Sequence, residues 1–179
     1  GSSNRATGFL SVVGAGGSNV ANATYSSVFG GASNTASGQY GFIGGGLNNN
    51  ASGCRSFVGS GRLNTSSGYN SAIVGGCFNC TSTNYTFIGG GERNQALGVY
   101  SSVVGGFSNC ALNVGAFIGG GCNNRAGVNS SVVGGIKNSS LGDCGFLGGG
   151  ESNTLTSGKN VLIGGFLNTN SGLYSSILG

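Results

Sequence analysis

The chain has 179 residues, of which 41 are glycine, and it contains no proline, methionine, tryptophan or histidine. With 37% apolar and only 6% charged residues it lacks the composition of a disordered chain, while its glycine content excludes a helical bundle and its lack of proline excludes collagen. The net charge of +4 comes from scattered basic residues rather than the cluster that nucleic-acid binding needs, and no run of about 18 apolar residues could span a membrane.

The whole chain is a tandem repeat with a period of fifteen residues. An asparagine, which we call the anchor, recurs at ten intervals of 15 residues and one of 14. The residue three before an anchor is glycine, the residue six before is aliphatic, and the residue two after is small except at Leu155 and Asn170. The anchors are Asn4, Asn19, Asn34, Asn49, Asn64, Asn79, Asn94, Asn109, Asn124, Asn138, Asn153 and Asn168.

Each repeat predicts two short strands joined by turns. In one unit the first strand covers residues 100–104, Gly105 and Gly106 form a turn, and the second strand covers residues 109–112. A glycine often closes a coil, as Gly98 does for the coil before this one. Fifteen residues are too few for a helical repeat or a propeller blade. We therefore predict an all-β fold, a parallel β-solenoid (β-roll) of twelve 15-residue coils, and a rod about 58 Å long at about 4.8 Å per coil.

Residues 1–179 form a single solenoid domain in this interpretation, either a segment of a longer array or a unit that stacks head to tail. Like residues lie above one another in such a stack, so the anchors are predicted to form a buried, hydrogen-bonded ladder. The alternative is that each anchor occupies a turn that needs a left-handed backbone, which asparagine tolerates. We favour the ladder.

A second apolar column is predicted on the outside of the first strand. Tyrosines lie nine before an anchor and phenylalanines seven before, while most other coils carry Phe, Val, Ile or Leu five before. An uncovered apolar stripe of this length favours a homo-oligomer, with a wider, partly exposed coil as the alternative. The candidate oligomer-face residues are Tyr25, Tyr40, Phe42, Phe57, Tyr85, Phe87, Tyr100, Phe117, Phe146 and Tyr174.

The sequence offers no set of residues for catalysis, so we expect no enzyme activity, cofactor or metal. Glu92, Asp143 and Glu151 are the three acidic residues; the two glutamates share a repeat position but lie four coils apart, and no histidine can act as a base. Six cysteines are present, and their favoured interpretation is scattered, buried small residues. A Cys77–Cys80 disulfide or an interchain disulfide is the alternative.

The units SSVVGGFSNCALN and YTFIGGGERNQALG resemble the head repeats of trimeric autotransporter adhesins. The resemblance implies a left-handed β-roll, three chains with apolar strand residues facing the trimer axis, and attachment to a host surface or glycan. The family's unit is usually one residue shorter, often has alanine where this chain has asparagine, and rarely has cysteines. Similar repeats would suit viral or phage fibres and other extracellular filaments.

These features predict a structural or adhesive protein that forms the rod of an extracellular fibre, filament or adhesin head, on a cell surface or virion. Two alternatives remain. Outward threonine and serine pairs such as Thr65 and Ser67 would suit an ice-binding solenoid, although the same positions hold Gln95 and Leu97 two coils later. The tyrosine column would suit carbohydrate binding.

Overall fold

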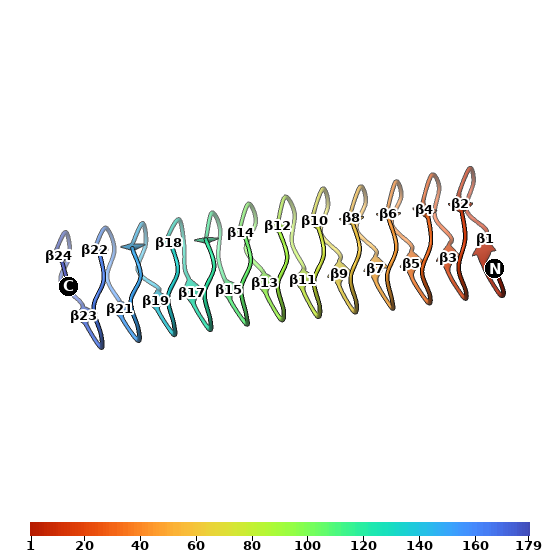
Figure 1. Ribbon diagram of the computed structural model, residues 1–179. Helices are drawn as coiled ribbons and strands as arrows, with labels where there is room; N and C mark the ends of the chain where they lie inside the picture. The colour runs from red at the N-terminus through yellow and green to blue at the C-terminus, as the bar shows by residue number, and fades with distance from the viewer.

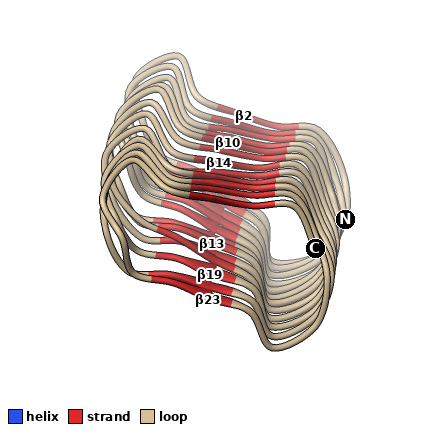
Figure 2. Ribbon diagram, turned by 90° about the vertical axis from the view of Figure 1, so that its left-hand side faces the viewer, coloured by secondary structure: helices blue, strands red, loops and turns tan.

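The computed structural model describes residues 1–179 and confirms the parallel β-solenoid. The chain has no helix, and hence none that could cross a membrane. Its strands form two parallel sheets of twelve strands each, and every coil contributes one strand to each sheet. The coils stack into one rod with the two termini at opposite ends (Figure 1), and the strands of each sheet overlay along the rod axis (Figure 2).

We name the two sheets by their strand numbers. The odd sheet consists of β1 (Arg5–Ala6), β3 (Val20–Ala21), β5 (Thr35–Ala36), β7 (Asn50–Ala51), β9 (Thr65–Ser66), β11 (Cys80–Thr81), β13 (Gln95–Ala96), β15 (Cys110–Ala111), β17 (Arg125–Ala126), β19 (Ser139–Ser140), β21 (Thr154–Leu155) and β23 (Thr169–Asn170). The even sheet consists of β2 (Val12–Val13), β4 (Ser27–Val28), β6 (Phe42–Ile43), β8 (Phe57–Val58), β10 (Ala72–Ile73), β12 (Phe87–Ile88), β14 (Ser102–Val103), β16 (Phe117–Ile118), β18 (Ser131–Val132), β20 (Phe146–Leu147), β22 (Val161–Leu162) and β24 (Ser176–Ile177).

The strands are shorter than the sequence predicted. The segment expected at residues 100–104 contains only the two-residue strand β14, because Tyr100 has a left-handed backbone with φ of 61° and cannot continue a strand. On the other side, Gly106 has φ of 92° and turns the chain toward the next anchor. An isolated parallel bridge between Phe107 and Cys122 links neighbouring coils along this glycine turn, and equivalent bridges continue along the rod.

Equivalent residues of successive coils pair directly. Val103 lies beside Ile118, which lies beside Val132, so each column holds the same repeat position. The 14-residue unit keeps this register because its missing residue falls in a turn: residues 127–130 join β17 to β18, where five residues join the corresponding strands elsewhere. A deletion there removes no inward-facing side chain.

The interior is a narrow apolar layer between the two sheets. The aliphatic residue six before each anchor faces inward from the even sheet, and the small residue two after each anchor faces it from the odd sheet; Ile118 and Ala111 are both fully buried. Leu155 is the largest residue at the second position, and Gly145 makes room for it, since a Cβ there would lie 3.3 Å from a Leu155 methyl group. Gly145 therefore leaves space for the one large side chain in this inward column.

Candidate interaction surface

The anchors form the predicted buried ladder, and Asn94 shows its geometry. Its backbone N–H donates to the Oδ1 atom of Asn79 at 2.9 Å, and its own Oδ1 accepts from the N–H of Asn109 at 3.0 Å. Its Nδ2 group donates to the carbonyls of Gly90 at 2.9 Å and Gly106 at 2.8 Å. Each buried amide thus fixes the glycine turn of its own coil and that of the next.

The ladder runs through all twelve anchors by eleven links from a backbone N–H to the preceding anchor's Oδ1, each of 2.9–3.0 Å. Most of its hydrogen bonds therefore join a side chain to the backbone, unlike the amide-to-amide stack of a cross-β ladder; only Asn34 donates to a neighbouring side chain, Asn19. The alternative of a left-handed anchor is wrong, because the left-handed residue precedes the anchor, as at Arg93 with φ of 55°.

The outer face of the even sheet, formed by the residues seven and five before each anchor, carries a large apolar side chain on every coil. Phe87 is 39% exposed and Val104 is 50% exposed, on neighbouring coils. From β4 to β24, each coil except that of β22 carries one bulky and one small residue at these two positions. The pairs are Ser27/Phe29, Phe42/Gly44, Phe57/Gly59, Ala72/Val74, Phe87/Gly89, Ser102/Val104, Phe117/Gly119, Ser131/Val133, Phe146/Gly148 and Ser176/Leu178.

The tyrosine column lies at the edge of this face and not on the strand, where the sequence placed it. All five of these tyrosines occupy the left-handed turn residue before an even strand and are exposed. Tyr25 and Tyr40 stack with ring centroids 5.0 Å apart, and Tyr85 and Tyr100 do so at 5.1 Å. Arg55 replaces tyrosine in the coil after Tyr40 and lies 5.8 Å from its ring centroid. The remaining tyrosine of the column, Tyr174, stands near the C-terminus.

The outer face of the odd sheet is mixed. Thr35, Thr65 and Thr154 point outward there, but Gln95 and Arg125 occupy the same column. The face therefore presents short groups of hydroxyls separated by other side chains.

The cysteines do not lie in the core. All six are free; five are half-buried and Cys144 is exposed, so their interpretation as buried small residues is wrong. The candidate Cys77–Cys80 disulfide is absent: Cys77 lies in the bridge column between Arg62 and Glu92, whereas Cys80 opens β11 beyond the buried anchor. Partial burial raises the pKa of the Cys80 thiol.

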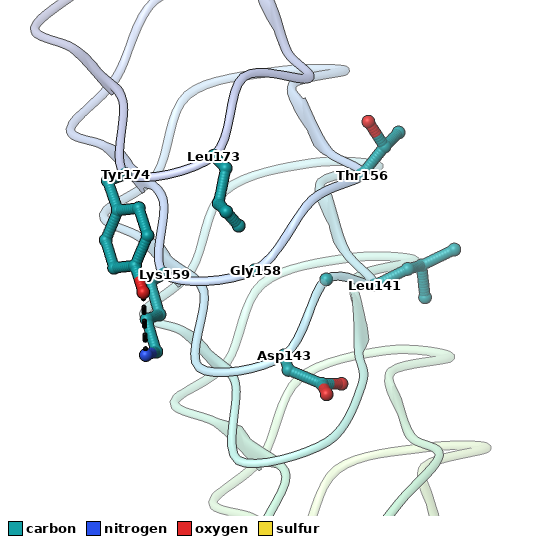
Figure 3. Close-up of a pocket in the computed structure, with 8 residues that line it drawn as sticks. Leu141, Asp143, Thr156, Gly158, Lys159, Leu173 and Tyr174 are labelled. Carbon is teal, nitrogen blue, oxygen red and sulfur yellow. Dashed lines mark hydrogen bonds between the residues drawn. The ribbon is translucent and has the colours of Figure 1, made fainter.

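No cluster of potential metal ligands is present, since no group of three or more His, Cys, Asp or Glu side chains occurs. Glu92 and Glu151 lie in the same bridge column, four coils apart, as the sequence predicted. A shallow groove of about 470 Å³ crosses the turns of three coils near the C-terminus, between Asp143, Lys159 and Tyr174. Lys159 donates a hydrogen bond of 3.1 Å to the Tyr174 hydroxyl, and both side chains lie on the same side of the groove (Figure 3).

No known protein family model matches the chain, and no curated protein matches it either. What the structure shares with the repeats of adhesin heads is the parallel β-solenoid architecture, here with twelve coils.

Proposed function

We propose that this protein is the structural or adhesive rod of an extracellular fibre, filament or adhesin head. The observation that carries the proposal is the continuity of the ladder. Two parallel sheets and the anchor column connect every coil to both neighbours, so bending the rod at any point would strain hydrogen bonds on several sides at once. A regular shaft with little charge is suited to presenting a surface at a distance from its point of attachment.

The proposed setting is a cell surface or virion, with the chain self-associating through its apolar outer face and contacting a host surface or glycan. Support comes from the repeat pattern and from the exposed apolar face of the even sheet. Such a face is larger than the scattered apolar residues that a solitary soluble protein usually exposes.

Two measurements test this proposal. Electron microscopy of the purified protein shows the shape of the particles, and the retention of protein-coated beads on cells or matrix measures adhesion. We expect straight particles whose length follows about 4.8 Å per coil, and retention of coated beads on cells or matrix. Flexible or globular particles would refute the rod. If the particles are straight but beads coated with the protein are retained no better than albumin-coated beads, the protein is a structural shaft without adhesive function.

Carbohydrate binding is a second candidate, favoured by the two stacked tyrosine pairs, which give flat, exposed aromatic surfaces. A glycan array with the assembled protein tests it. A bound glycan should be lost in Tyr85→Ala and retained in the control Phe107→Ala, an exposed aromatic residue of the bridge column that contacts none of the stacked tyrosines. Equal binding by both variants would exclude the stacked pair as the site.

Ice binding is a third candidate and rests on the outward hydroxyls of the odd sheet, such as Thr35 and Thr65. Gln95 and Arg125 interrupt that column, so it is the least favoured of the three. A thermal hysteresis assay decides it, and freezing without hysteresis would exclude ice binding.

A further inference from the structure

The outer face of the even sheet has a self-complementary shape. Where a coil has phenylalanine seven before its anchor, it has glycine five before, as in Phe87 and Gly89. Where the first position is small, the second is bulky, as in Ser102 and Val104. Each coil therefore pairs one bulky residue with one small residue at the same height on the rod, and their order reverses from each coil to the next between β10 and β20. In the single chain the Phe87 ring leans toward its own Gly89, with its Cε1 atom 3.5 Å from where a Cβ would stand, so the ring must turn outward to fill a partner's hollow.

A twofold axis parallel to the rod would match these projections and hollows. If two copies face each other across such an axis, midway between the two columns, the first column of one copy faces the second column of the other at the same coil. Phe87 would then pack over Gly89 of the second copy, and Val104 over its Ser102. The match holds in every coil from β4 to β24 except that of β22, which has Val161 and Ile163.

Other registers fit less well. A shift by one coil sets Phe87 against Val104 and leaves Gly89 opposite a serine. With a shift by two coils, bulky residues face each other at the point where the alternation breaks. Phe42 of one copy then faces Val74 of the other, and Phe57 of the second copy faces Phe29 of the first. In an antiparallel arrangement, the bulky and small residues of the central coils can also be matched. That arrangement places Phe57 against Val161 of the second copy and leaves the first coils of each copy uncovered.

We infer that a second copy of this chain covers the even-sheet outer face, forming a parallel, in-register dimer in which each bulky residue fills the hollow beside a small residue of its partner. This inference deepens the self-association in the proposed function and rests on it. The face measures about 53 Å along eleven coils and about 13 Å across, or about 700 Å² per chain, which is close to a standard protein interface. The pairing favours two chains over the three that the adhesin resemblance implies, since only two such faces can meet over their whole width.

Exchange of bulky and small residues in one coil tests the dimer. Ser102→Phe places two phenylalanines against two Val104 side chains and should raise the dimer dissociation constant at least about 30-fold. The double variant Ser102→Phe/Val104→Gly gives this coil the pattern of its neighbours and should restore the wild-type value. Mixing Ser102→Phe with Val104→Gly should yield mainly heterodimers, because the introduced phenylalanine of one chain then faces the introduced glycine of the other.

Native mass spectrometry and analytical ultracentrifugation measure these outcomes, and circular dichroism checks that each variant is folded. Thr65→Phe, on the outer face of the odd sheet, is the control and should leave the dissociation constant unchanged. A monomer at all concentrations or a threefold mass would overturn the inference. So would failure of the double variant to restore dimers, which is the result expected of reversed rods, where the introduced phenylalanine meets Phe117. If microscopy shows straight rods but the protein stays monomeric, the dimer is refuted and the proposed function as a structural shaft is retained.

Discussion

Replacing Asn94 by leucine should destabilise the solenoid strongly, although the two side chains have the same branched shape. The substitution removes the acceptor for the Asn109 N–H and both donors to the Gly90 and Gly106 carbonyls, at 3.0, 2.9 and 2.8 Å. Asn94 and Asn109 are fully buried, so water cannot replace the lost acceptor. The Gly106 carbonyl still accepts from the Glu92 N–H, so the Asn109 N–H and the Gly90 carbonyl are the two groups that lose their partner. At about 1–3 kcal/mol for each, we expect a loss of about 2–5 kcal/mol.

Equilibrium unfolding in urea, followed by circular dichroism, measures the total loss, and hydrogen exchange locates it. The Asn109 amide should lose protection first, because its acceptor is the deleted oxygen. Asn113→Leu is the matched control, since Asn113 is an exposed asparagine in the same region that uses only its backbone carbonyl, which accepts from Ala116. The control should change stability by less than about 0.5 kcal/mol.

If Asn94→Leu and Asn113→Leu have the same unfolding free energy within about 0.5 kcal/mol, the anchor ladder does not hold the coils together. In that case the aliphatic core and the strand hydrogen bonds alone would account for the stability. A loss with unchanged exchange at Asn109 would equally contradict the reasoning, because the effect would then arise elsewhere.

Three other positions test the turn, the core and the thiols. Gly121→Ala should cost at least about 2 kcal/mol by urea unfolding, because φ is 87° there and the new Cβ would meet the next coil's backbone, whereas Gly120→Ala, with nothing within 4 Å of its Cβ, should be nearly neutral. Ile118→Ala, at a fully buried core position, should lower the unfolding free energy by about 2–5 kcal/mol; a change below about 1 kcal/mol would mean the core is not tightly packed. Burial raises the pKa of the Cys110 thiol, so it should react with iodoacetamide more slowly than exposed Cys144 at about pH 8, as read by mass spectrometry. Equal alkylation rates of the two thiols would contradict the raised pKa of Cys110. Because that folded pKa lies above the ordinary 9.0, the contribution of Cys110 to stability is complete below pH 9.0 and is lost as the pH rises further.

The period, the parallel stacking and the inward columns could all be predicted from the amino-acid pattern. In a solenoid each residue contacts its equivalent one repeat away, so a constant requirement for burial or hydrogen bonding leaves the same residue type at the same interval. This is why the anchors and the aliphatic residues such as Ile118 could be assigned without coordinates.

The ends of the strands, the partners of the anchor amides and the direction of the cysteines required the folded backbone. Those features depend on turn conformations, such as the left-handed Tyr100 and Arg93, and on carbonyls presented by the next coil. A repeat pattern states which residues are alike but not how the backbone turns between them. The two-residue strands, the backbone partners of Asn94 and the outward thiols follow from that turn geometry.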